Sequence, residues 1–224
     1  YHELLADADS IDAMPVVVAD LHSALAPILL AIEYDRPGTR VVYLMSDQGA
    51  LPLAFSRSVA ELGAAGLLAG TVTVGQAFGG DLEAVTVHSG LLAARLALDA
   101  EVVVVTQGPG NLGTGTRWGF SGVNAGEAIN AAATLGGRPV ATLRISGADA
   151  RERHTCRGEV APHDPRAGRR RARDAVHRAE LLQQQLRGEV VALTVHEADD
   201  RREGRRKQLA DQDGEPARML FIVR

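Results

Sequence analysis

Short runs of apolar, mostly β-branched residues alternate with stretches in which apolar residues recur every three or four positions. Strands that are apolar at every position are buried on both faces, and strands that alternate with helices form parallel sheets. Over residues 1–150, the sequence therefore predicts a Rossmann-like α/β fold, a three-layer sandwich with a mainly parallel sheet of about five strands. The predicted strands cover residues 16–20, 40–45, 70–75, 101–106 and 139–145, and the predicted helices cover residues 21–34, 51–68, 88–98 and 122–135.

The pattern weakens after residue 146. Residues 151–178 are crowded with Arg and have almost no apolar periodicity, whereas residues 188–196 fit a strand. Residues 201–215 are charged and low in apolar content, which favours disorder. We therefore expect an α/β domain over residues 1–150 and a basic, poorly packed tail over residues 151–224.

Charge separates the same two parts. Residues 1–150 hold 7 Arg, no Lys and 15 Asp or Glu, a balance of −8, whereas residues 151–224 have a balance of +4. An acidic domain without clustered cations is not expected to bind nucleic acid. No apolar stretch approaches the ~20 residues of a membrane span, and the single cysteine, Cys156, excludes an internal disulfide. We expect a cytoplasmic protein that binds neither nucleic acid nor membrane.

Polar residues follow each predicted strand. In parallel sheets, ligands bind beyond the carboxyl ends of the strands, where helix N-termini also point. We therefore expect a site along this edge, with Asp20 and the three catalytic candidates His22, Asp47 and Asp81 as acid–base or metal-holding groups. Asp81 with Glu83 could hold a cation such as Mg²⁺. The alternative is that these side chains cap helices and stabilise turns.

Two glycine-rich loops are the candidates for ligand binding. The loop over residues 107–116 has four glycines in eight residues, so its backbone N–H groups could surround a phosphate or carboxylate. It lacks the Lys-Ser/Thr ending of a Walker A loop and the glycine spacing of a dinucleotide fingerprint. The second loop covers residues 75–83. The nominated ligand-binding residues are Gln76, Gly79, Gly80, Gln107, Gly108, Gly110, Asn111, Gly113, Thr114, Gly115 and Thr116.

Long motifs within residues 49–52, 69–85, 107–111 and 113–122 are similar to those of an uncharacterised bacterial family, the domain of unknown function 3866, found mainly in high-GC bacteria. The resemblance covers roughly residues 8–154 and implies no particular activity. Members of that family have an additional β-rich segment upstream. Because this chain opens at Tyr1 and not at Met, we expect it to be N-terminally truncated relative to the family.

The tail departs from the resemblance. Where the family continues with a Ser-His-His stretch and apolar strands, this chain becomes rich in Arg. Codons for residues 160–164, read one base later, can encode Ser-His-His-Thr. One hypothesis is therefore that residues after about 155 are translated out of frame, which sequencing the gene would test. The alternative is a genuine basic tail that binds acidic partners.

These features predict binding of a small anionic metabolite, a phosphate or a carboxylate, at the carboxyl edge of the sheet. If the protein is an enzyme, hydrolysis or group transfer is favoured over redox chemistry, because the dinucleotide fingerprint is missing. Bound Mg²⁺ would support hydrolysis or group transfer. The alternatives are a non-catalytic ligand sensor and a structural subunit of a homo-oligomer, whose small-residue helix over residues 122–133 packs against a copy of itself.

Overall fold

A parallel β-sheet forms the centre of the computed structural model, which describes residues 1–114, 116, 118–146 and 191–196. Its strand order is β4-β3-β2-β5-β1-β6-β7, and each neighbouring pair is parallel. The predicted α/β fold is therefore confirmed: β4 joins the five strands predicted for residues 1–150, and β7 lies within the strand expected over residues 188–196. The strands are β1 (Pro15–Ala19), β2 (Val41–Ser46), β3 (Gly70–Val74), β4 (Leu82–Ala84), β5 (Val102–Gln107), β6 (Arg138–Ser146) and β7 (Val191–His196).

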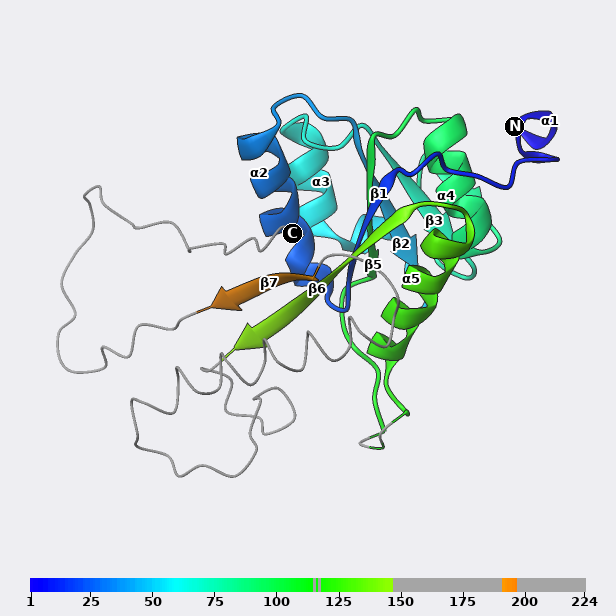
Figure 1. Ribbon diagram of the computed structural model, residues 1–224. Coiled ribbons are helices and arrows are strands. Elements are labelled where there is room, and N and C mark those ends of the chain that lie inside the picture. Colours follow the sequence, from blue (N-terminus) through cyan, green and yellow to red (C-terminus); the bar gives the residue numbers. More distant parts are fainter. Residues whose placement is uncertain (115, 117, 147–190, 197–224) are drawn as a thin grey trace, which may run out of the picture.

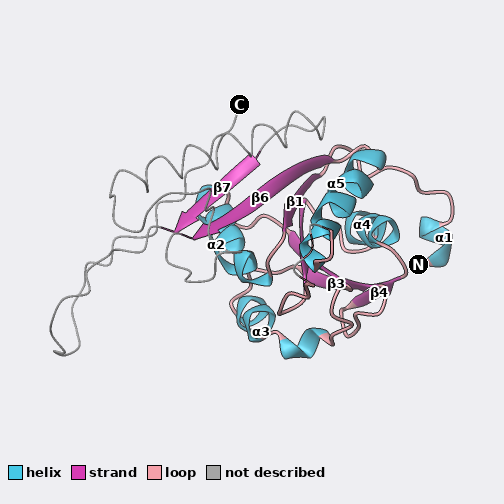
Figure 2. Cartoon of the chain, turned by 90° about the horizontal axis from the view of Figure 1, so that it is seen from below, coloured by secondary structure: helices cyan, strands magenta, loops and turns pink. Residues whose placement is uncertain are grey.

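Helices cover both faces of the sheet, as Figures 1 and 2 show: α2 and α3 lie on one face, and α4 and α5 on the other. None of the helices in the described part of the chain is long and apolar enough to cross a membrane. The α-helices are α1 (His2–Leu5), α2 (Leu25–Asp35), α3 (Arg57–Ala64), α4 (Val87–Leu96) and α5 (Asn124–Thr134); the 3₁₀ turns are η1 (His22–Ala24), η2 (Leu53–Phe55) and η3 (Ser121–Val123).

Helix α3 is shorter than the helix predicted over residues 51–68, and local capping explains both ends. Ser56 is the N-cap, and its hydroxyl oxygen accepts a hydrogen bond from the Val59 N–H at 3.0 Å. Gly66, with φ +73°, then turns the chain out of the helix. The apolar residues before Ser56 belong to η2 and to the loop that leads to it.

The core consists of two layers separated by the sheet. Strand residues of alternate parity face opposite layers: Leu44 and Val105 pack with α4 and α5, whereas Tyr43 and Val104 pack with α2 and α3. Strands β2 and β3 are buried along their whole lengths. The continuous apolar pattern of the sequence thus reflects burial on both faces.

The connection from β3 to β4 is unusual because it joins two parallel neighbours through residues 75–81 with no helix. Parallel crossovers normally need a dozen or more residues. Gly80 allows the short path: a Cβ atom there would lie 2.8 Å from the Thr73 nitrogen and 2.9 Å from the Leu82 oxygen. Residues 82–84 therefore form the edge strand β4, directly after this short connection.

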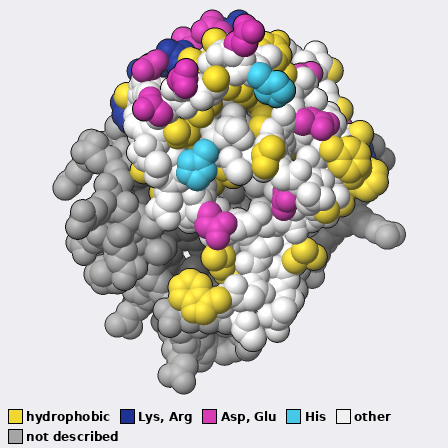
Figure 3. Space-filling view, turned by 90° about the vertical axis from the view of Figure 1, so that its right-hand side faces the viewer, with side chains coloured by type: hydrophobic (Ala, Val, Ile, Leu, Met, Phe, Trp, Pro, Cys, Tyr) yellow, Lys and Arg dark blue, Asp and Glu magenta, His cyan; other side chains and the backbone are white. Residues whose placement is uncertain are grey.

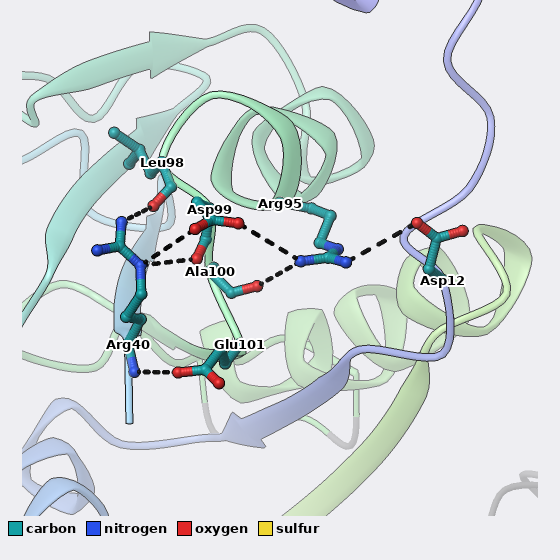
Figure 4. Close-up of polar contacts among 7 residues, drawn as sticks. All are labelled: Asp12, Arg40, Arg95, Leu98, Asp99, Ala100 and Glu101. Atoms are coloured by element: carbon teal, nitrogen blue, oxygen red, sulfur yellow. Dashed lines mark hydrogen bonds and ion pairs between the residues drawn. The ribbon is translucent and has the colours of Figure 1, made fainter. Parts of the chain in front are cut away.

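Charged residues fasten the opposite, amino-terminal edge of the sheet (Figure 4). Arg40, next to β2, donates to the carbonyl oxygens of Leu98 and Asp99 at 2.8 and 3.0 Å. Arg95, in the last turn of α4, pairs with Asp12 and Asp99, both at 3.9 Å. These contacts hold the chain ahead of β1, the start of β2 and the α4–β5 loop together, far from the carboxyl ends of the strands.

Candidate functional site

The adjacent strands β1 and β5 send their following segments to opposite faces of the sheet. The chain leaves β1 towards α2, on one face, and leaves β5 towards α5, on the other. Such a topological switch point leaves a crevice at the carboxyl edge, the usual ligand site of open α/β sheets. Here a cleft with about 220 Å³ of empty space, open to solvent, lies between the ends of β1, β2 and β5 and the start of α5.

The strand register brings the polar side chains of this cleft together. Ser46 and Gln107 are paired neighbours at the ends of β2 and β5, and Asp20 directly follows β1. By alternation along their strands, all three lie on the face covered by α4 and α5. The polar residues that line the cleft are Asp20, Ser46, Gln48, Gln107, Ser121 and Asn124.

Gln107 is the most informative of these residues because it is only 5% exposed. Its side-chain Nε2 donates to the main-chain oxygen of Asp20 at 3.0 Å. Its Oε1 is buried and has no hydrogen-bond partner among the described residues. Rotating the amide by half a turn would place Oε1 against the Asp20 main-chain oxygen, and two acceptors would then face each other. The bond from Nε2 therefore fixes the orientation in which Oε1 is the atom without a partner. A buried acceptor without a partner costs about 1–3 kcal/mol.

The wall opposite the strand ends is the beginning of α5. The turn η3 precedes it directly, so the N–H groups of Ser121, Val123 and Asn124 donate to the main-chain oxygens of Leu112, Phe120 and Ser121, and the end of the helix contributes partial positive charge. Ala125 and Ala128 of this helix line the cleft, and their small side chains leave the space open. Ser121 is held in place by the Leu112 N–H, which donates to its hydroxyl at 3.1 Å, and by its own bond to Asn111 Oδ1 at 3.2 Å.

His22 lies at the same edge but belongs to the other face of the sheet. Its Nε2 is 2.7 Å from the Ser56 hydroxyl, and its Nδ1 is 3.1 Å from the Tyr43 hydroxyl. The Tyr43 hydroxyl is in turn 2.9 Å from Thr106 Oγ1, which donates to the Gln107 main-chain oxygen at 2.7 Å. Tyr43, Ser56 and Thr106 are all buried. These residues form a continuous hydrogen-bonded chain beneath α2 and α3.

One assignment of protons satisfies every bond of that chain. Ser56 accepts from Val59 and donates to His22 Nε2, and His22 then donates from Nδ1 to Tyr43. Tyr43 donates to Thr106, whose hydroxyl donates onward. A neutral His22 fits this order. Burial lowers the pKa of His22 below its usual value of 6.5, and the Gln107 main chain opposes that shift in part. Burial likewise raises the pKa of the Tyr43 phenol, against the effect of its bond to Thr106.

The structure does not bring the three catalytic candidates together. The Asp47 carboxylate accepts from the Gln76 N–H at 2.7 Å and so connects the ends of β2 and β3. Asp81 lies towards the amino-terminal part of β3, where its carboxylate accepts from the N–H and the hydroxyl of Thr71, both at 2.8 Å. Both carboxylates hold neighbouring segments of the chain in the way that the turn-stabilising alternative describes.

The loop over residues 107–116 separates into two parts. Gln107 and Gly108 are buried at the sheet edge, and Gln107 lines the cleft. Farther along, Gly113 and Phe120 form an antiparallel bridge, so the loop continues as an exposed hairpin that extends past the start of α5 (Figure 1). Gly110 and Asn111 are exposed in it and do not line the cleft. Thr114 and Thr116 bond to each other at 3.0 Å. Gly115 lies outside the described residues.

The second nominated loop belongs to the β3–β4 connection and not to the cleft. The Gly79 N–H donates to Glu83 Oε1 at 2.9 Å, and the Gly80 N–H donates to Thr73 Oγ1 at 3.3 Å. Gln76 is exposed. Strand β3 is separated from β5 by β2. The residues of this loop thus shape a strand connection two positions away from the switch point.

The cleft carries little charge. Among the described residues that line it, Asp20 is the only charged one, and none is Lys or Arg. On the face seen in Figure 3, Lys and Arg side chains are visible only at the upper end and margin, whereas Asp and Glu side chains extend from the upper end to the middle. Within the described residues, no group of three or more His, Cys, Asp or Glu side chains could hold a metal ion.

Several residues of this edge were not nominated from the sequence. Ser121 and Asn124 belong to the start of α5, and the only local signal for them is their place after the glycine-rich loop. Tyr43 and Ser56 meet His22 from distant positions in the chain. No spacing within the sequence shows that β5 lies between β1 and β2, which is the arrangement that assembles the cleft.

A family model described as a protein of unknown function (DUF3866) matches residues 1–163. The chain belongs to the DUF3866 family. The match confirms the resemblance noted in the sequence and extends beyond its expected limits at both ends. It includes β1 to β6 and every residue that lines the cleft, whereas residues 164–224 lie outside it. No curated protein and no solved structure matches the DUF3866 chain.

Proposed function

We propose that this DUF3866 protein binds a small metabolite through an anionic group, a phosphate or a carboxylate, in the cleft at the ends of β1 and β5. The observation that carries the proposal is the position of the cleft. It lies at the switch point of a parallel sheet and faces the first turn of an eleven-residue helix. The partial positive charge of a helix N-terminus favours an anion at such a point.

The size and charge of the cleft restrict the class of ligand that can bind there. Its empty space of about 220 Å³ includes solvent at the open mouth of the cleft. Only a small molecule, or one end of a larger one, fits there. With Asp20 on the lining and no described basic side chain, a singly charged carboxylate fits better than a doubly charged phosphate.

The anion contacts in this proposal come from α5 and not from the glycine-rich hairpin. Thr114 Oγ1 is within hydrogen-bond distance of Thr116 Oγ1 and of the Gly119 oxygen. Both threonines are exposed and do not line the cleft. The hairpin instead bonds to Ser121 through Leu112 and Asn111, and so positions the start of the helix.

A thermal-shift screen of the full chain against carboxylates, sugar phosphates, nucleotides and divalent metals tests the proposal. A ligand present at 100 times its Kd stabilises the folded state by about 2.7 kcal/mol. The variant Ala125→Leu fills the cleft and should abolish the shift. Ala133→Leu makes the same change on the exposed face of α5 and should preserve it. A shift that survives Ala125→Leu, or no shift with any compound, would contradict the proposal.

Hydrolysis or group transfer is the second candidate, and one observation favours it: His22 Nε2 lies 2.7 Å from the Ser56 hydroxyl. A histidine in this position can activate a serine as a nucleophile. However, Ser56 is 3% exposed and accepts the Val59 N–H as a helix cap. A fluorophosphonate probe decides between the roles. Labelling that is lost in Ser56→Ala supports the reaction, and an unlabelled protein supports binding alone.

A further inference from the structure

We infer that the ligand of the cleft carries a hydroxyl group that donates a hydrogen bond to Gln107 Oε1, so that Gln107 determines which ligand binds. The inference rests on the proposed function, because it concerns the same cleft. It adds a requirement that an anionic group alone does not meet, and it favours small hydroxy acids over plain carboxylates.

The side chain of Gln107 holds an acceptor for which its surroundings provide no donor. Gln107 lines the cleft and is 5% exposed, and its Oε1 is buried without a hydrogen-bond partner among the described residues. The bond from Nε2 to the Asp20 main-chain oxygen, at 3.0 Å, keeps the amide in this orientation. Buried carbonyl oxygens are almost always hydrogen-bonded. A ligand that brings a donor to the inner end of the cleft would supply the missing bond.

The hydroxyl groups of the cleft already donate to other atoms. Ser46 donates to Gln48 Oε1 at 2.6 Å, and Ser121 donates to Asn111 Oδ1 at 3.2 Å. Thr106 donates to the main-chain oxygen of the next residue at 2.7 Å. The protons of these three hydroxyl groups are therefore committed, and the buried side-chain oxygen depends on a donor from outside the protein.

A single acceptor atom favours a hydroxyl group over the other common donors. A hydroxyl group has one proton to donate, whereas a primary amide has two N–H groups and an ammonium group has three. Each donor that is buried without an acceptor costs free energy, and a buried cation needs a partner of opposite charge as well. A hydroxyl group satisfies Gln107 Oε1 and leaves no donor over. A small hydroxy acid meets this requirement and the proposed function together.

Four compounds of nearly the same shape test the inference separately from the proposed function: glycolate, propionate, hydroxyacetone and butanone. Glycolate and hydroxyacetone carry a hydroxyl group where propionate and butanone carry a methyl group. Glycolate and propionate are carboxylates, whereas hydroxyacetone and butanone are uncharged. Titrations of the ¹⁵N-labelled full chain, followed by amide chemical shifts, should give an affinity about tenfold higher for each hydroxyl compound than for its methyl counterpart.

The two comparisons have independent outcomes. Equal affinity within each pair would overturn the inference, because water would then satisfy Gln107 Oε1, and a preference for the two carboxylates would still support the proposed function. A preference for the hydroxyl compounds without a preference for the carboxylates would support the inference and contradict the anionic part of the proposed function. If none of the four compounds binds, both fail.

A matched pair of variants assigns the effect to Gln107. Gln107→Met keeps the length of the side chain and removes the acceptor, so glycolate should bind only as tightly as propionate. Asn130→Met exchanges an amide for a thioether on the exposed surface of α5 and should keep the difference between the two compounds. A folded Gln107→Met protein that still prefers glycolate would overturn the role of Gln107.

The side-chain amide resonance of Gln107 in the unaltered chain decides the matter if Gln107→Met does not fold. A hydrogen bond accepted by Oε1 polarises the whole amide group, so the Nε2 signal should shift more with glycolate than with propionate at equal saturation. Equal shifts with the two compounds would overturn the inference.

Discussion

At the residue scale, the buried hydrogen-bonded chain through Tyr43 shows how polar groups are accommodated within the sheet. Tyr43 is completely buried, and its hydroxyl lies between His22 Nδ1 and Thr106 Oγ1 at 3.1 and 2.9 Å. Buried polar groups are tolerated when each has a partner, and removing one partner is costly for the others.

Tyr43→Phe should therefore lower the free energy of unfolding by about 1–3 kcal/mol, because it leaves the N–H at His22 Nδ1 without an acceptor and Thr106 Oγ1 without a donor. Tyr34→Phe makes the same chemical change at a side chain that is 91% exposed and should have almost no effect. Urea unfolding of the two variants and the parent chain measures the difference. Equal, small effects in both variants would mean that the Tyr43 hydroxyl does not stabilise the fold.

His22 should make stability depend on pH. Burial lowers the pKa of His22 in the folded state, so the unfolded chain binds the proton more readily. Stability is then full above the unfolded pKa of about 6.5 and falls as the pH drops through and below that value. Between about pH 7.5 and about pH 5.5, the parent chain should lose more stability than His22→Gln. Parallel losses in the two proteins, measured by urea unfolding, would show that His22 does not titrate in this way.

The position of His22 just after a strand was evident from the sequence, but its partners were not. Ser56 and Thr106 lie 34 and 84 positions away along the chain. Gln107 was nominated as part of a glycine-rich loop. Its unused oxygen depends on a contact with the Asp20 main chain, which is 87 positions away. Long-range contacts of this kind leave no local pattern.

At the scale of elements, the helices and strands of the α/β domain follow from local patterns, and the β3–β4 connection does not. Apolar β-branched runs predicted β1, β2, β3, β5 and β6, since burial on both faces demands such residues. Strand β4 has three residues and only half-buried or exposed side chains, so it carries little apolar signal. The glycines and acids of residues 75–83 indicated a ligand loop, but their contacts shape a tight parallel connection.

Gly80→Ala tests this interpretation of the loop. The added Cβ would lie within 3.0 Å of two backbone atoms, which cannot move without disturbing β3 and β4, so we expect a loss of about 1–3 kcal/mol. Gly63→Ala, in α3, meets nothing within 4 Å and should raise stability by about 0.5–1 kcal/mol. Thermal unfolding of both variants measures the contrast. A neutral Gly80→Ala would show that the connection tolerates a side chain and that its glycines need another explanation.

At the scale of the whole molecule, the strand order creates the site. Strand β5 inserts between β1 and β2, and its connection to β6 passes over the face opposite to α2. The general rule that ligands bind at the carboxyl edge could be applied to the sequence, but the strand order could not be derived from it. The whole glycine-rich loop was therefore expected to bind the anion. The cleft instead lies beside Gln107, at the start of that loop, and against α5.

The central claim is that the cleft between β1, β5 and α5 is where this DUF3866 protein binds its ligand. Titration of the ¹⁵N-labelled chain with acetate, the simplest probe for a carboxylate site, followed by amide chemical shifts, tests the location directly. The account predicts that the largest changes occur at Asp20, Gln107 and residues 121–125. Changes confined to the hairpin tip near Thr114, or to the β3–β4 connection near Gly80, would contradict it.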